Sequence, residues 1–302
     1  MLSVVVPVYG CAHVLERLYS ELHSVLDSFV EDFELILVDD ASDDKAWPLI
    51  TKLAKSTGHV RGIRLSRNFG QHAAIMAGLR ASLGSVCVVM DCDLQDPIDK
   101  IPEMIAMLSD EHNVVVACRD LRSESRSRRL QSRIYEQVMK IVSGQTIDSS
   151  ATNFSALSRK VVNEYIKFSE KNHHFLYVIS WLGFEPRKMA IARNKSARGG
   201  SSYSLKRRVK HAASGLFFYS SRVMVGLAIA GITIALTGIM ITCLLFVLSQ
   251  FSRFESGWLS IVSLILVASG INIAVVSVVG IYVNQVFDYA KRRPLFVVRD
   301  LI

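Results

Sequence analysis

Three carboxylates stand within six residues, at Asp91, Asp93 and Asp96, directly after an apolar run from Val86 to Met90. The run predicts a buried strand, and Asp91 and Asp93 share one side-chain parity, so both can point into the crevice beyond its carboxyl end. Two carboxylates about 4 Å apart repel by roughly 4 kcal/mol at an effective dielectric of about 20, and a hard divalent cation reverses that sign. The pattern therefore predicts a Mg²⁺ or Mn²⁺ site, with a solvated acidic loop or a set of helix caps as the alternative.

The first 120 residues predict the scaffold that positions these carboxylates. Apolar, β-branched runs alternate with segments of helical periodicity; strands are expected at 2–6, 33–38, 60–65, 86–90 and 113–118, and helices at 14–26 and 71–82. This alternation predicts an α/β fold with a mainly parallel sheet covered on both faces. The chain has no Gly-x-Gly-x-x-Gly and no Walker loop, which argues against the common dinucleotide-binding and P-loop folds. Because the first strand begins at Leu2, we expect no cleavable signal peptide before it.

The five cysteines show no paired spacing; they are Cys11, Cys87, Cys92, Cys118 and Cys243. We interpret them as small buried apolar residues in a reducing compartment. Cys92 lies between the two aspartates, but its parity turns it towards the opposite face.

An arginine-rich segment follows the last predicted strand of the sheet. Its six arginines stand among serines at positions Arg119, Arg122, Arg126, Arg128, Arg129 and Arg133. One interpretation is a solvated, mobile loop; the other is a phosphate clamp, because guanidinium groups match phosphate oxygens bidentately. The arginines lack interleaved aromatic residues and other basic residues flank the apolar tail, so we expect no nucleic-acid partner despite the net charge of +8.

The C-terminal third predicts a membrane anchor. Mean hydropathy is +0.31, and two long runs without charge, 223–249 and 258–287, are each long enough to cross a hydrocarbon core of about 30 Å. Basic residues precede the first run and follow the second, so the positive-inside rule places both outer flanks of the pair in the cytoplasm. Asn272 is expected to bond a neighbouring helix rather than a substrate. The expected domains are a catalytic domain at 1–203, an amphipathic interfacial segment at 204–222, the transmembrane helices 223–249 and 258–287, and a cytoplasmic tail at 288–302.

An ordered set of motifs resembles the family 2 glycosyltransferases, and within them the polyprenyl-phosphate glycosyltransferases such as dolichol-phosphate mannose synthase and the bactoprenol glucosyltransferases. The motifs are Ser3–Tyr9, Val38–Ser42, Leu65–Gln71, Met90–Pro97, Trp181–Phe184, Ser201–Ser204 and Arg292–Leu295. The resemblance covers nearly the whole chain and implies a Rossmann-like GT-A fold.

The resemblance also implies roles for individual residues. A nucleotide sugar is expected at Pro7, Val8, Tyr9, Asp39, Asp40, Arg67 and Asp91, with an aspartate near the uracil edge. The metal positions correspond to Asp91, Asp93 and Gln95, and the catalytic positions to Asp93, Gln95, Asn153 and Arg119. The acceptor phosphate is expected at Arg119, Arg128, Arg133, Arg198, Ser201 and Ser202.

The implied reaction is the metal-dependent, inverting transfer of a hexose from a nucleotide sugar, with uridine as the expected base, to undecaprenyl phosphate. It is expected at the cytoplasmic face of a bacterial inner membrane and yields a lipid-linked sugar for modification of cell-surface glycans, in the cell wall or in lipopolysaccharide. Family members often form oligomers through their helices, and the glycines of the two apolar runs permit a homo-oligomer.

Three departures from the family pattern keep alternatives open. Gly10-Cys11-Ala12 stands where Asn-Glu-Glu is usual, Asn153 replaces an aspartate found in many members, and Ser196 replaces an arginine, with Arg198 nearby. The lost acidic residues favour a catalytically inactive membrane scaffold, whereas the retained Asp91, Asp93 and arginine run argue against it. A processive polysaccharide synthase is the other alternative, but the chain lacks the Gln-x-x-Arg-Trp signature and a multi-helix channel.

Overall fold

The computed structural model describes residues 1–119, 150–169, 174–192 and 293–302, together with individual positions between 261 and 291. The chain divides into two compact units. The first comprises Met1–Glu136, Ile147–Ser202 and Pro294–Ile302, and the second Gln137–Thr146 and Tyr203–Arg293. The described residues of the first unit contain the predicted catalytic scaffold.

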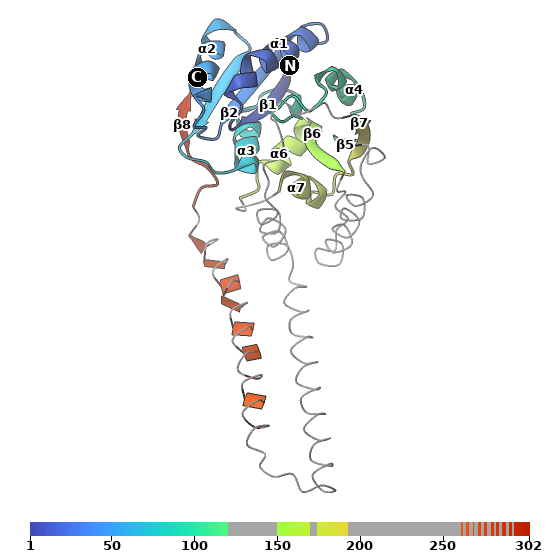
Figure 1. Cartoon of the computed structure of the whole chain (residues 1–302). Helices are drawn as coiled ribbons and strands as arrows, with labels where there is room; N and C mark the ends of the chain where they lie inside the picture. Colours follow the sequence, from blue (N-terminus) through green and yellow to red (C-terminus); the bar gives the residue numbers. More distant parts are fainter. Residues whose placement is uncertain are drawn as a thin grey trace. The chain divides into compact units, whose positions relative to one another are not determined.

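A single sheet forms the centre of the first unit (Figure 1). Its strand order is β7 (Arg187–Ile191), β5 (Val114–Arg119), β6 (Ala151–Ser158), β4 (Val86–Val89), β1 (Leu2–Val8), β2 (Phe33–Asp39), β3 (Val60–Leu65) and β8 (Val298–Leu301). Strand β1 pairs in parallel with β2 and β4, β2 with β3, and β5 with β7. Strand β6 is antiparallel to β4 and β5, and β8 is antiparallel to β3. The sheet is therefore mixed around a parallel centre.

Helices cover both faces of this sheet. The α-helices are α1 (Leu15–Asp27), α2 (Ala46–Ser56), α3 (Gln71–Ala81), α4 (Ile101–Ala106), α6 (Arg159–Tyr165) and α7 (Phe175–Trp181); the short 3₁₀ helices are η1 (Ala12–Val14) and η2 (Ile98–Lys100). Because strand side chains alternate, Leu35 and Leu37 pack into one core cluster with Leu18 and Leu22 of α1. Ile36 and Val38 of the same strand pack into the opposite cluster, which contains the buried face of α3.

The five predicted strands are all present, with ends that differ by at most two residues from the expected ones. Strands β6, β7 and β8 were not predicted, because polar or charged residues interrupt their apolar pattern. Examples are Asn153 and Ser155 in β6 and Arg187 and Lys188 in β7. Strand β8 comes from the segment expected to be a separate tail. Its end is joined to the sheet by the Ile302 N–H donating to the Gly62 carbonyl at 3.0 Å. The C-terminal residues therefore belong to the first unit.

The described positions of the second unit between 261 and 290 are helical. Within the described part of the chain, no helix has the length and apolar character of a membrane-spanning segment. The predicted span 223–249 and the interfacial segment 204–222 lie outside the described residues, as does about half of the predicted span 258–287.

Candidate functional site

The sheet brings most of the predicted site residues to one edge. The parallel strands β1, β2 and β4 end next to one another, and each is followed by a predicted site segment: Tyr9, Asp39–Asp40 and Asp91–Asp93. Strand β6 begins at this edge, because Ser155 pairs with Val89, the last residue of β4. Asn153 stands two residues before Ser155 and therefore lies beside the segment that follows β4. Loops at this edge are where open α/β sheets bind ligands.

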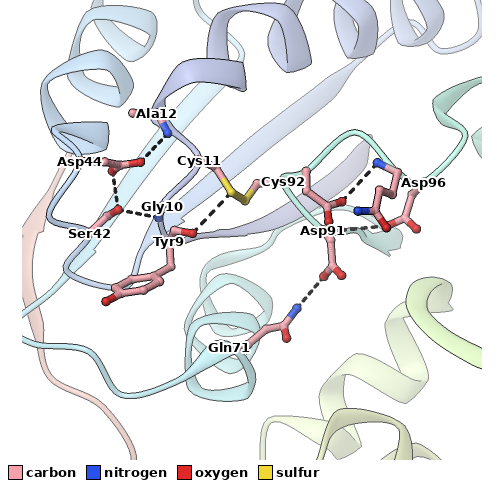
Figure 2. The surroundings of a disulfide bond; sticks show 12 residues. Tyr9, Gly10, Cys11, Ala12, Ser42, Asp44, Gln71, Asp91, Cys92 and Asp96 are labelled. Carbon is pink, nitrogen blue, oxygen red and sulfur yellow. Dashed lines mark hydrogen bonds between the residues drawn. A yellow bond between two sulfur atoms is a disulfide. The ribbon is translucent and has the colours of Figure 1, made fainter. Parts of the chain in front are cut away.

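The loop after β1 is held by the loop after β2 (Figure 2). The Ala12 N–H donates to Asp44 Oδ2 at 2.8 Å, the Gly10 N–H donates to Ser42 Oγ at 2.7 Å, and the Ser42 hydroxyl donates to Asp44. Burial alone would raise the pKa of Asp44, but the bonds from Ser42 and from backbone amides outweigh it and lower that pKa. Sequence reasoning missed Asp44. It supplies an anion beside Gly10-Cys11-Ala12, where the chain lacks the family's glutamates.

Asp39 and Asp40 point to opposite faces of the sheet and have different partners. Asp39 is fully buried; it accepts the Ser42 N–H at Oδ1 over 2.8 Å, and its Oδ2 lies 3.4 Å from Arg64 Nε without hydrogen-bond geometry. Asp40 accepts the N–H groups of Phe69 and Gly70 at 2.7 and 2.9 Å, which fixes the loop before α3. Burial raises the pKa of both carboxyls, and their donors and the nearby arginines offset only part of that rise.

Asp91 and Asp93 lie in a tight turn beyond β4, both half-buried. Gln71, the first residue of α3, donates from Nε2 to Asp91 Oδ1 at 2.5 Å, as Figure 2 shows. The Asp91 N–H donates to the buried Asp96 at 3.1 Å, and the Gln95 N–H donates to Asp93 Oδ1 at 3.2 Å. Leu94 adopts φ +57° to close the turn, a conformation that costs about 1 kcal/mol or more outside glycine. The turn is thus built by its own carboxylates and by Gln71, whose role sequence reasoning missed.

The donor set of this turn fits a hard divalent cation. Among the described residues, no group of three or more His, Cys, Asp or Glu side chains converges on one point. Mg²⁺ is commonly held by one or two carboxylates, with the remaining oxygens supplied by substrate phosphates and water. Asp91 and Asp93 at the sheet edge match that incomplete protein ligand set.

The free-thiol interpretation of Cys11 and Cys92 is wrong, because the two residues form a disulfide (Figure 2). Strand β4 ends at Val89, so strand parity does not extend to Cys92, which lies in the turn and faces the loop after β1. The two cysteines are 81 residues apart, a separation without any local sequence pattern. Cys87 and Cys118 are buried, as expected, and are not part of this disulfide. The disulfide covalently joins the loop of Tyr9 to the turn of Asp91 and Asp93.

The remaining predicted site residues have different surroundings. Pro7 and Val8 are buried within β1, whereas Tyr9 is 48% exposed. Arg67 is exposed, with its guanidinium carbon 4.2 Å from the ring centroid of Phe69. Arg119 is exposed at the end of β5, and its N–H donates to the Ser150 carbonyl at 2.9 Å. The other predicted acceptor residues lie outside the described residues; they are Arg128, Arg133, Arg198, Ser201 and Ser202.

Comparison with known proteins gives matches along the chain. The family model described as glycosyl transferase family 2 matches residues 3–166. The Bacillus subtilis protein named "Uncharacterized glycosyltransferase YkcC" is 31% identical over 299 residues, which is 98% of this chain and 93% of that protein. The undecaprenyl-phosphate 4-deoxy-4-formamido-L-arabinose transferase of Shewanella sediminis is 26% identical, covering 99% of this chain and 92% of that protein. A solved structure of glucosyl-3-phosphoglycerate synthase from Mycobacterium tuberculosis matches at 16% identity and a TM-score of 0.49, over 72% of this chain and 77% of that one.

Proposed function

Since this chain belongs to glycosyl transferase family 2 and is a glycosyltransferase, we propose that it transfers a hexose from a uridine nucleotide sugar to undecaprenyl phosphate with the help of Mg²⁺ or Mn²⁺. The product would be a lipid-linked sugar for modification of cell-surface glycans. The observation that carries the proposal is the joining of two loops at one sheet edge: the loop of Tyr9 and the turn of Asp91 and Asp93 are tied by the Cys11–Cys92 disulfide.

The donor is proposed to lie across the ends of β1, β2 and β4. Asp39 supports a nucleobase contact, because its buried Oδ2 has no hydrogen-bond partner among the described residues and an acceptor without a donor is costly in the interior. An imide N–H, as in uracil, is the matching donor. Tyr9 offers an exposed ring beside it, and the exposed Arg67 offers a cation.

The diphosphate is proposed to lie against the turn after β4. When bound there by Asp91 and Asp93, with Gln95 beside them, a divalent cation would offset the negative charge that develops on the leaving diphosphate. The chain's own contribution is to hold the two carboxylates in place before substrate arrives. Gln71 and Asp96 do this for Asp91, through bonds to its side chain and N–H, respectively, and the Gln95 N–H does it for Asp93.

The acceptor is proposed from the name of relatives such as the Shewanella sediminis transferase. A lipid monophosphate is already anionic near neutral pH, so it needs positioning and charge compensation rather than proton removal. Arg119 at the end of β5 supplies a cation at the sheet edge where β1, β2 and β4 end, and the amide of Asn153 can orient a phosphate oxygen. Direct attack of that oxygen on the anomeric carbon would invert its configuration. Asn153 in place of an aspartate is therefore compatible with activity.

The membrane setting is part of the same proposal. The uncharged runs 223–249 and 258–287 are proposed to cross a bacterial inner membrane, with the catalytic unit on the cytoplasmic side. A polyprenyl phosphate keeps its tail in the bilayer, so an enzyme anchored there meets the head group at the interface. The segment 204–222 is proposed to lie in that interface.

Calorimetry of UDP binding in the presence of Mn²⁺ tests this proposal. The full-length protein in detergent is expected to bind UDP in a metal-dependent manner. Asp93→Asn is expected to weaken metal-dependent binding at least tenfold, whereas Asp99→Asn, a change of an exposed carboxylate in η2, leaves it unchanged. Absence of UDP binding by the unmodified protein, or equal affinity of Asp93→Asn and the unmodified protein, would contradict the assignment.

A further inference from the structure

A row of alternating charges crosses three neighbouring strands on one face of the sheet. Asp39 of β2 is the register partner of Arg64 of β3, and Arg64 is the register partner of Asp300 of β8. Register partners carry their side chains on the same face, so the three groups lie side by side. Asp300 is thus separated from Asp39, a residue of the proposed nucleotide site, by Arg64 alone, although the two aspartates are far apart in the sequence.

Arg64 lies between the two carboxylates, and Asp300 Oδ2 lies as close to Arg299 Nε as to Arg64. Arg64 Nε lies 3.4 Å from Asp39 Oδ2, and Arg64 Nη1 lies 3.7 Å from Asp300 Oδ2. The guanidinium carbon also lies 5.9 Å from the ring centroid of Trp47 in α2. The Arg64 side chain is 27% exposed, that of Asp300 is 43% exposed and that of Asp39 is fully buried, so exposure decreases from Asp300 towards the nucleotide site.

Strand β8 fixes the position of Asp300. The Gly62 N–H donates to the Ile302 carbonyl at 2.8 Å, and the Ser66 N–H donates to the Val297 carbonyl at 2.9 Å, so backbone bonds flank Asp300 on both sides. A long, partly exposed arginine side chain otherwise samples solvent, and holding it costs conformational entropy. Asp300 gives the guanidinium a partner on its solvent side and limits its movement away from Asp39.

We propose that Asp300 is a positioning residue of the nucleotide site, acting through Arg64 to hold the buried carboxylate of Asp39 for a nucleobase N–H. This inference rests on the proposed function. Strand β8 follows the second unit in the sequence. According to the inference, it contributes to the site that recognises the nucleobase. Removal of Asp300 leaves Arg64 free to turn outward, and the buried carboxyl of Asp39 then loses an ordered cationic neighbour.

The test compares the affinities of UDP and inorganic pyrophosphate, measured by calorimetry with Mg²⁺ on the full-length protein. Asp300→Asn removes the more exposed ion pair, with Arg64, and is expected to weaken UDP binding about threefold to fivefold. Arg64→Gln also removes the more buried ion pair, with Asp39, and is expected to weaken UDP binding about tenfold. Pyrophosphate has no base, so its affinity is expected to stay unchanged in both variants. Asp300→Glu is expected to restore UDP affinity to within about twofold of the unmodified protein.

A double-mutant cycle separates this role from general stabilisation. If Asp300 acts through Arg64, adding Asp300→Asn to Arg64→Gln produces no further loss of UDP affinity. The matched control is Arg61→Gln in β3, the strand of Arg64. It removes a 2.7 Å ion pair with Glu34 of β2 and is expected to lower the melting temperature without changing UDP affinity. Unchanged UDP affinity in Asp300→Asn, or equal losses for UDP and pyrophosphate, overturns the inference alone. Absence of UDP binding by the unmodified protein overturns the proposed function as well.

Discussion

Breaking the Cys11–Cys92 disulfide is expected to destabilise the catalytic unit by between about 2 and 4.5 kcal/mol. The upper value follows from the closed loop of 81 residues: in the chain-entropy description, releasing it returns about 15 cal/mol/K to the unfolded chain, or about 4.5 kcal/mol at 25 °C. The melting temperature of a unit of this size falls by about 2 to 4 °C per kcal/mol, so a loss of roughly 10 °C is expected.

The assay is thermal unfolding of the full-length protein with and without dithiothreitol, together with mass spectrometry of alkylated thiols. Reductant is expected to expose two additional thiols and to lower the melting temperature. Cys11→Ala, Cys92→Ala and the double variant are expected to melt at similar temperatures and to lose their response to reductant, because each lacks the same covalent bond. Cys118→Ala is the control, since it removes a buried cysteine that is not part of this disulfide.

Equal numbers of alkylated thiols with and without reductant would refute this reasoning, as would additive losses in the double variant. The proposed cytoplasmic location gives the result a further consequence. Disulfides that form in reducing compartments are usually transient or redox-sensitive. The stability of the loops that carry Tyr9, Asp91 and Asp93 is then expected to depend on the thiol redox state around the protein.

Further perturbations address the buried charges and the packing beneath the site. Burial raises the pKa of Asp40 above its ordinary value of 3.8. The wild type is therefore expected to lose part of its advantage in melting temperature over Asp40→Asn as pH rises above about 4. An advantage that grows with pH would contradict the buried surroundings of this carboxyl. Glu34 behaves in the opposite way: burial acts to raise its pKa, but bonds from Ser3, the Leu83 amide and Arg61 outweigh it and lower that pKa below 4.5. The advantage of the wild type over Glu34→Gln is therefore expected to be full near neutral pH and to be lost as pH falls through and below about 4.5, which pH-dependent melting can check. Gly78→Ala is expected to lower stability by about 1 to 3 kcal/mol, measured by the same melts, because the new Cβ would lie 2.3 Å from Val5 Cγ1; an unchanged melting temperature would show that α3 packs less closely on β1 than described.

The central strands and the site motifs were predictable from the sequence for a physical reason. Strands β1, β2 and β4 are buried on both faces and mostly apolar, and aspartates stand at or just after the ends of β2 and β4. The alternation predicted a parallel centre, and parallel neighbours end at one edge, where Asp39 and Asp91 lie; the roles expected for these two residues came from the family resemblance. Local spacing was therefore sufficient where the parallel centre of the sheet determines position.

Contacts between distant segments were not predictable in the same way. Nothing local in the sequence joins Cys11 to Cys92 or Arg64 to Asp300, because both pairs depend on which strands become neighbours. Strand parity also misplaced Cys92, since the chain leaves the strand at Val89 and turns through Leu94 with positive φ. Asp44 and Gln71 were overlooked because their roles lie in bonds to other loops rather than in a motif of their own.

The most direct test of the central claim is sugar transfer itself. Purified full-length protein in detergent is incubated with undecaprenyl phosphate, a panel of labelled uridine nucleotide sugars, and Mg²⁺, Mn²⁺ or a chelator. Formation of a lipid-linked hexose is expected with one sugar of the panel, only with metal, and reduced about 10² to 10³-fold by Asp93→Asn but not by Asp99→Asn. Transfer that proceeds equally well in Asp93→Asn, or no lipid-linked product from any uridine nucleotide sugar, would contradict the account.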